Sequence, residues 1–335
     1  MDDKFGNKLA NGLLETPDFV IADEKAFCEL DVRLGYSEIT VEDGAGLAGK
    51  LPLISIDDLG AFTPAYQAQL GVSGITGRAL LIGGGLAQFR AGVWTRAKDR
   101  QGRAATVTAM VTQALHQARQ TQSRPLGLFV EDEDIDAFTA AIGPSPAPQR
   151  RYGWCTLQLN GGRTLDEFFS SQPRKSRQTW RRDQRDGEQL GLSYETVAFD
   201  DETTRQAAPM IAEVSRRNGL PEHHQLTRWR MGAYKHRPGQ SCYLRTSNDQ
   251  GVVAYTACRT WGTTLQAHTV GIDPAVSDRR SVYHYAAYLA PLAAALAQGW
   301  SQVEYGIAHE QPKLARGCDA VTVWQIDFGP GRQEA

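Results

Sequence analysis

Two stretches of sequence, GVVAYTACRT from Gly251 to Thr260 and TTLQAHTVGI from Thr263 to Ile272, decide the fold. Both alternate apolar and polar side chains, which is the pattern of half-buried strands. Trp261 and Gly262 lie between them and predict a turn that joins the strands into a hairpin. A polar, basic loop, Asp273 to Arg280, follows this hairpin.

A helix and a further strand are expected after this loop. SVYHYAAYLAPLAAALAQ, residues 281–298, repeats apolar side chains at helical spacing, and Gly299 is expected to cap the helix. QVEY, residues 302–305, predicts a strand. The start of such a helix offers unpaired N–H groups and the positive end of the helix dipole, so it suits pyrophosphate or another anion.

The same order of elements occurs earlier in the chain. Residues 79–82 and 88–94 predict a hairpin around a glycine turn, and a basic loop follows at residues 96–103. Residues 106–120 place apolar side chains on one helical face, and residues 126–130 predict a strand. The equivalent helices and strands are separated by equal lengths of chain, so one unit occurs twice.

This duplicated arrangement resembles the GNAT acyltransferase fold in its tandem form. The resemblance implies an α/β fold with mixed sheets, built from two GNAT-like domains at residues 1–150 and 151–335. Arg100 to Ala104 (RQGRA) resembles the GNAT pyrophosphate loop, although Asp99 stands where that loop carries Gln or Arg. The second unit has basic residues but no glycine pattern in its loop, so its side chains are expected to hold any phosphate.

The C-terminal half resembles one branch of this fold more closely, the Fem-type aminoacyltransferases and the related BioF2-like acyltransferases. SSQPRKSRQTWRR, residues 170–182, is similar to the basic helical motif of that group. VGID, residues 270–273, is similar to the strand end before the binding loop. VEYG, residues 303–306, with Lys313 after it, is similar to an acidic-aromatic-glycine motif followed by lysine.

The resemblance implies an enzyme that forms an amide when the amine of a small acceptor, such as a specialised metabolite, attacks the ester of an aminoacyl-tRNA. Lys313 is expected to stabilise the oxyanion, and Glu304 and His309 to accept the proton of the amine. Side chains expected to bind donor phosphates are Arg174, Lys175, Arg177, Arg181, Arg182, Arg279, Arg280 and Arg316. Side chains expected to line the substrate cleft are His268, Asp273, Tyr283 and Tyr305.

The segment from Arg174 to Arg185 carries a local excess of positive charge. It has six basic residues and one acidic residue, Asp183. Such an excess suits an RNA backbone or a polyphosphate, and it is equally typical of a solvated helix face. Trp180 in this segment is expected either to stack on a base or to pack inward.

Two other functions fit the same pattern. One is a GNAT-type N-acyltransferase with acyl-CoA as donor, whose pyrophosphate would lie on Arg100 to Ala104 or on Arg279 and Arg280. The other is a non-catalytic module that binds RNA or glycan. Transfer of label from each donor distinguishes the enzymes, and binding without transfer would indicate the module.

Composition excludes several classes of protein. The chain of 335 residues has 36 Lys and Arg against 38 Asp and Glu, a formal net charge of -2, so nucleic-acid contacts must be local. It has no apolar run of about 20 residues, so no membrane segment is expected. Its five cysteines are scattered and it has no H-E-x-x-H motif, so we expect no metal and no cofactor. We expect a cytoplasmic monomer.

Overall fold

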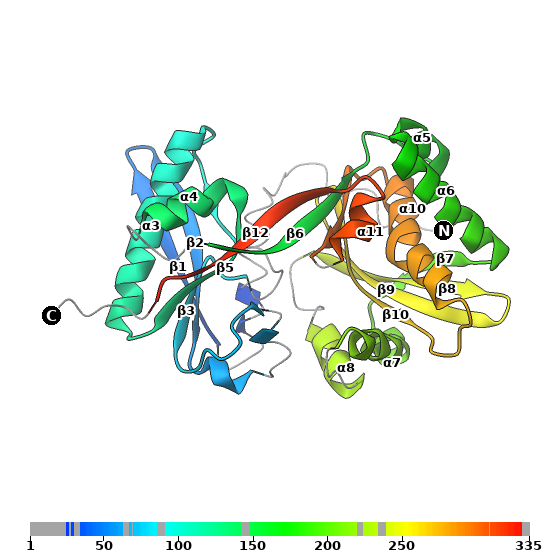
Figure 1. The fold of residues 1–335 in the computed structure, drawn as a ribbon, viewed down its shortest axis with the longest axis horizontal. Helices are drawn as coiled ribbons and strands as arrows, with labels where there is room; N and C mark the ends of the chain where they lie inside the picture. Colours follow the sequence, from blue (N-terminus) through cyan, green and yellow to red (C-terminus); the bar gives the residue numbers. More distant parts are fainter. Residues whose placement is uncertain are drawn as a thin grey trace. The chain divides into compact units, whose positions relative to one another are not determined.

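The computed structural model describes residues 25–26, 28–29, 34–62, 67–68, 70–85, 91–141, 148–219, 224–233, 239–307 and 309–329. These residues form two compact units (Figure 1). Of the described residues, the C-terminal unit contains those within 155–305 and 311–319, and the N-terminal unit contains those within 25–154, 306–310 and 320–329. The division therefore differs from a single cut at residue 150, because the last strand joins the N-terminal unit.

The N-terminal unit is built on a mixed sheet. Strands β1 (Leu34–Asp43), β2 (Gly46–Ile56) and β3 (Ala79–Ile82) are antiparallel neighbours, and β3 pairs in parallel with β5 (Arg124–Glu131). Strand β12 (Asp319–Asp327) pairs antiparallel with β5. A short 3-10 turn, η1 (Leu59–Ala61), follows β2.

Helices α3 (Arg100–Gln120) and α4 (Asp132–Ala140) belong to this unit. The predicted apolar face of α3 is confirmed, since Val107, Met110, Val111, Ala114, Leu115 and Ala118 are buried. The helix begins six residues earlier than predicted because Asp99 caps it, accepting a hydrogen bond from Gly102 N at 2.8 Å. Residues 100–104 are therefore the first helical turn and not a loop.

The hairpin predicted for residues 79–82 and 88–94 is wrong in its pairing. Strand β3 and the short β4 (Trp94–Thr95) each pair with β2, and not with each other. The glycines from Gly83 to Gly85, which follow β3, all have positive φ, a conformation that glycine adopts without strain. Residues 86–90 lie outside the described residues.

The C-terminal unit contains a sheet with the strand order β6, β11, β10, β9, β8, β7. The strands are β6 (Gln149–Gln158), β7 (Ser193–Ala198), β8 (Gln240–Asn248), β9 (Gly251–Trp261), β10 (Thr264–Ile272) and β11 (Gln302–Gly306). The predicted β9–β10 hairpin is confirmed, and β10 and β11 pair in parallel. The helices are α5 (Leu165–Ser171), α6 (Arg174–Gln189), α7 (Asp201–Arg217), α8 (His224–Ala233), the helical segment 279–297 and α11 (Glu310–Leu314).

Two layers of helices cover the faces of this sheet (Figure 1). Helices α5, α6 and the segment 279–297 pack on one face, where Trp180 and Leu292 share a core with Leu265. Helices α7 and α8 pack on the other face through Ile211 and Met231. Because successive side chains of a strand point to opposite faces of the sheet, the strands contribute apolar side chains to the core on each face.

The segment 279–297 confirms the predicted helix and contains a π-helical turn. It consists of α9 (Arg279–His284), the π turn η3 (Tyr285–Leu289) and α10 (Ala290–Ala297). In the π register the carbonyl of Ala286 would accept from residue 291, which is a proline without an N–H. The buried hydroxyl of Thr256 on β9 donates to that carbonyl instead, at 2.7 Å.

Candidate functional site

The strands β10 and β11 separate within the C-terminal unit. Their pairing runs only from Thr264 and Gln302 to Gln266 and Glu304, whereas β10 continues to Ile272. At the point of separation β10 contains a bulge, because its register against β9 shifts at His268. The half-buried His268, predicted to line the substrate cleft, lies at this opening.

Glu304 lies in a buried polar row across three strands. Gln266 of β10 is opposite Glu304 on one side and Arg259 of β9 on the other. The Arg259 guanidinium donates to Gln266 Oε1 at 3.2 Å, and all three residues are at most 2% exposed. Burying a carboxylate or guanidinium group costs free energy unless polar neighbours pair with it, and the residues of this row are such neighbours.

Two other predicted catalytic residues have contrasting environments. Lys313 lies in α11 and is 5% exposed, so it is not a surface lysine. His309 is exposed, has a φ of 48° and belongs to the N-terminal unit. The structure therefore places Glu304 and Lys313, but not His309, in the C-terminal unit.

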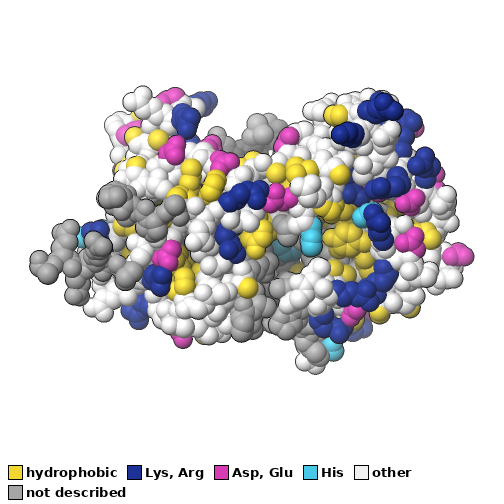
Figure 2. Space-filling view, in the orientation of Figure 1, with side chains coloured by type: hydrophobic (Ala, Val, Ile, Leu, Met, Phe, Trp, Pro, Cys, Tyr) yellow, Lys and Arg dark blue, Asp and Glu magenta, His cyan; other side chains and the backbone are white. Residues whose placement is uncertain are grey.

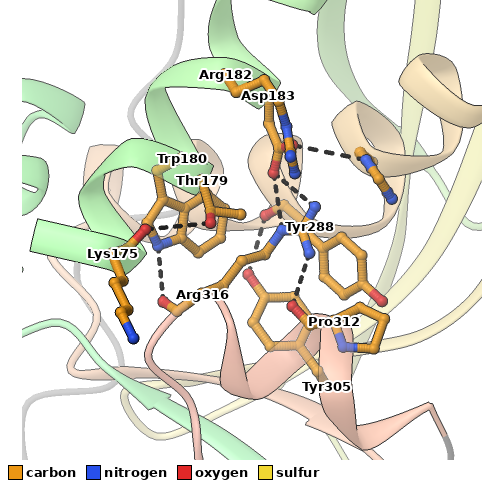
Figure 3. A network of polar contacts seen from close by, with 10 residues as sticks. Lys175, Thr179, Trp180, Arg182, Asp183, Tyr288, Tyr305, Pro312 and Arg316 are labelled. Atoms are coloured by element: carbon orange, nitrogen blue, oxygen red, sulfur yellow. Dashed lines mark hydrogen bonds and ion pairs between the residues drawn. The ribbon is translucent and has the colours of Figure 1, made fainter.

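A buried ion pair joins helix α6 to the segment after α11 (Figure 3). The guanidinium of Arg316, which is 2% exposed, donates from Nε to Asp183 Oδ2 at 2.8 Å, and its Nη2 lies 2.7 Å from the same oxygen. Arg316 Nη1 also donates to the carbonyl of Pro312 at 2.7 Å. Arg316 was predicted to bind donor phosphate, and here its guanidinium is engaged with a carboxylate inside the protein.

Trp180 supports this ion pair from the core of the unit. Its ring is fully buried against Phe168 and Phe169, and its Nε1 donates to the carbonyl of Arg316 at 2.8 Å. The inward alternative for Trp180 is therefore confirmed, and stacking on a base is wrong. Trp180 is the side chain through which α6 joins the apolar core of the unit.

Aromatic rings of the π turn complete the network. Tyr288 lies against the Arg316 guanidinium, 4.1 Å from ring centroid to Cζ. The hydroxyl of Tyr305 on β11 donates to the Tyr288 carbonyl at 2.9 Å, so the turn is tied to the strand beside the separation. Burial raises the pKa values of Tyr283, Tyr288 and Tyr305, so all three hydroxyls are protonated at neutral pH. Of the predicted cleft residues, Tyr305 is thus in the core and Tyr283 is half-buried.

His284 is a member of this network that the sequence analysis missed. Its Nδ1 lies 3.6 Å from Asp183 Oδ1, and its side chain is 17% exposed. Burial and the positive charges of Arg316, Arg280 and Arg182 lower the pKa of His284 to about 4. Asp183 is the sole acid in the basic run from Arg174 to Arg185, and this was the signal in the sequence that Asp183 pairs with a basic side chain elsewhere in the chain.

The exposed face of α6 is basic. Arg174, Lys175, Arg181 and Arg182 are exposed and Arg177 is half-buried, whereas Ser176, Trp180, Asp183 and Gly187 face the core. Figure 2 shows Lys and Arg side chains gathered on this unit around apolar side chains. Of the four exposed side chains, Arg182 also has its Nη2 atom 3.6 Å from the buried Asp183 Oδ1.

The starts of the two repeated helices are each capped by an aspartate. Asp99 caps α3, and Asp278 caps α9 with its Oδ1 accepting from Ser281 N at 3.1 Å. That hydrogen bond lowers the pKa of Asp278, so the cap is an anion. A carboxylate occupies the place where a pyrophosphate would meet each helix start.

The arginines near these helix starts differ in availability. Arg103 makes a bidentate pair with Asp134, with both N–O distances 2.8 Å, and Arg100 pairs with Asp136 at 3.3 Å. Arg279 donates to the Pro274 carbonyl at 3.3 Å and remains half-buried, and Arg280 is exposed. Asp273, predicted to line the cleft, instead accepts from Ala275 N at 2.8 Å within a turn.

The duplicated β-α-β unit and the separating strands define an α/β fold of two tandem GNAT-like domains. The structure of FemX is similar to this chain, with a TM-score of 0.57, 10% identity, and coverage of 92% of this chain and 89% of that one. A DUF2156 domain from Agrobacterium fabrum has a TM-score of 0.55 with 11% identity, covering 93% of this chain and 90% of that chain. L-PGS from Bacillus licheniformis has a TM-score of 0.52 with 11% identity, covering 89% and 85%.

No protein-family model matches the sequence, and no curated protein matches it significantly. At these identities the structural similarity establishes the fold alone. Within the part of the chain that the structure describes, none of the helices has the length and apolarity to cross a membrane.

Proposed function

We propose that the protein is an acyltransferase that moves an aminoacyl group from aminoacyl-tRNA to the amine of a small acceptor. Two observations on the chain support this donor. The exposed face of α6 presents Arg174, Lys175, Arg181 and Arg182, a strip suited to an RNA backbone. The observation that carries the choice is the pair of aspartate caps on α3 and α9, which repel the pyrophosphate of coenzyme A.

The chemistry needs no covalent enzyme intermediate. The acceptor nitrogen attacks the ester carbonyl carbon, the C–N bond forms, and the C–O bond to the terminal ribose breaks, releasing the hydroxyl of the tRNA. Positioning of the two substrates and stabilisation of the oxyanion supply most of the rate. Lys313, buried in α11, is the group we assign to the carbonyl oxygen, since a buried ammonium stabilises an adjacent anion more than an exposed one does.

The test is transfer of label from a mixed aminoacyl-tRNA pool to a panel of amines by the purified protein. We expect transfer, and we expect Arg174→Ala/Lys175→Ala/Arg181→Ala to raise the KM for tRNA at least tenfold. The slope of log KM against log salt should fall by roughly one for each phosphate that the variant no longer neutralises. Unchanged KM in the triple variant would refute the assignment of α6.

The matched control removes three exposed arginines from α7. Arg205, Arg216 and Arg217 each form an ion pair with a glutamate of the same helix, so their removal changes charge equally without touching α6. The variant with all three changed to Ala should keep the wild-type KM for tRNA. An equal rise in both variants would mean that only overall charge matters.

An acyl-CoA donor is the second candidate, because the separation of β10 and β11 is the opening through which GNAT folds are expected to admit an acyl arm. Arg279 and Arg280 would then hold the pyrophosphate beside the Asp278 cap. Label that leaves acetyl-CoA, but not aminoacyl-tRNA, would favour this donor.

A further inference from the structure

Asp183 has one carboxylate oxygen that is satisfied and one that is not. Oδ2 is bound by Arg316, whereas Oδ1 is buried without a hydrogen bond. Two groups face Oδ1 at 3.6 Å, the Nδ1 atom of His284 and an Nη2 atom of Arg182. Neither contact is short enough for a hydrogen bond, but the negative charge of the buried oxygen favours the tautomer of His284 that carries its hydrogen on Nδ1.

This tautomer leaves a lone pair on the other ring nitrogen, Nε2. The His284 side chain keeps 17% of its surface exposed, so the ring is accessible from outside the core. Asp183 itself is held by Arg316, which is held in turn by Pro312 and by the ring of Tyr288. The orientation of the imidazole therefore depends on a chain of buried contacts and not on a flexible surface.

The charges around His284 come from three elements. Asp183 and Arg182 belong to α6, Asp278 and Arg280 to the start of α9, and Arg316 follows α11. The positive charges together with burial keep the imidazole neutral at pH 7, whereas Asp278 acts in the opposite direction. A neutral imidazole whose Nδ1–H faces Asp183 keeps a lone pair on Nε2 that can accept a hydrogen bond from an amine.

We propose that His284 is the group that accepts the proton of the attacking amine, with Asp183 and Arg316 as positioning residues. The inference rests on the proposed acyl transfer. When the acceptor nitrogen bonds to the ester carbon, Nε2 of His284 takes the proton of the resulting ammonium. The same proton then passes to the departing ribose oxygen as the C–O bond breaks, so the enzyme ends the cycle unchanged. His284 directly precedes the π turn, in which the Tyr288 carbonyl accepts a hydrogen bond from Tyr305 of β11 at 2.9 Å.

The experiment measures single-turnover transfer by wild type, His284→Asn and His284→Gly, with aminoacyl-tRNA and separately with acetyl-CoA. His284→Asn keeps a donor toward Asp183 but has no base, and it should lower kcat by about 10²–10⁴-fold with little change in KM. Imidazole in the buffer should restore part of the kcat of His284→Gly. His116→Asn, a change at an exposed histidine of α3, is the matched control and should keep full activity.

Full kcat in His284→Asn, or a decrease in His284→Gly that imidazole does not restore, would overturn the inference. A nitrogen-15 NMR spectrum of wild type provides a readout that does not depend on the donor. It should show the Nδ1–H tautomer at pH 7, and a ring protonated on Nε2 would overturn the inference. Wild-type transfer from acetyl-CoA alone would refute the aminoacyl-tRNA donor while leaving His284 testable with acetyl-CoA.

Discussion

Replacing Arg316 by Met removes the partner of a carboxylate that has no access to water. The side chain of Asp183 is 0% exposed, and the Met side chain offers it neither charge nor hydrogen bond. Breaking a buried pair from one side costs about 3–5 kcal/mol of the free energy of unfolding, because the other charge stays desolvated. Burial already raises the pKa of Asp183 against the opposing effect of Arg316, so Arg316→Met should raise the pKa of this carboxyl group further.

A double-mutant cycle isolates the pair. Asp183→Leu with Arg316→Met replaces both charges by apolar groups, and this double variant should be at least about 2 kcal/mol more stable than the sum of the single changes predicts. The assay is urea unfolding, with hydrogen exchange of the α6 amides to assign the transition to the C-terminal unit. A coupling energy below about 0.5 kcal/mol would refute the view that this pair fastens α6 to the segment after α11.

Three further changes test other features. His284 has a folded pKa of about 4, below its unfolded value, so its contribution to stability is complete above about pH 6.5 and is lost as the pH falls toward 4. In urea unfolding across this pH range, His284→Asn should lack this loss, which amounts to up to about 3 kcal/mol of the free energy of unfolding. Burial raises the pKa of Asp134 to about 6, so its contribution is complete below about pH 4 and is lost as the pH rises through 6, and Asp134→Asn should remove this opposite slope in the same titration. Asp278→Asn keeps a capping oxygen but removes the charge, so calorimetry should show tighter pyrophosphate binding while stability changes by less than about 0.5 kcal/mol.

Local pattern was enough to predict much of the C-terminal unit. The β9–β10 hairpin, the helix after it and β11 follow from alternation and helical spacing, both of which are set by burial on one face of each element. The prediction of the N-terminal hairpin was wrong, because β3 and β4 each pair with β2. Local sequence patterns do not indicate which strands pair. The predicted start of α3 was six residues too late, because the Asp99 side chain caps the helix at an earlier position.

The candidate site was harder to predict because its contacts join residues distant in sequence. Arg316 and Asp183 are separated by 133 residues, and no local pattern relates them. Arg316 was predicted to bind donor phosphate from its place shortly after Lys313, but it is buried and pairs with the Asp183 carboxylate. His284 lies inside an apolar helix, where its role becomes visible only when α6 is packed against it.

The position of β12 has a consequence for how the chain is made. Strand β12 pairs with β5 in the N-terminal unit, yet it is synthesised after every strand of the C-terminal unit. On the ribosome, the unit that is begun first must therefore wait with one edge of its sheet open until residue 327 has emerged. The described residues of the C-terminal unit end at 319, so all of them are synthesised before β12 is complete. The N-terminal unit, although it is begun first, therefore cannot complete its sheet until the C-terminal unit has been synthesised.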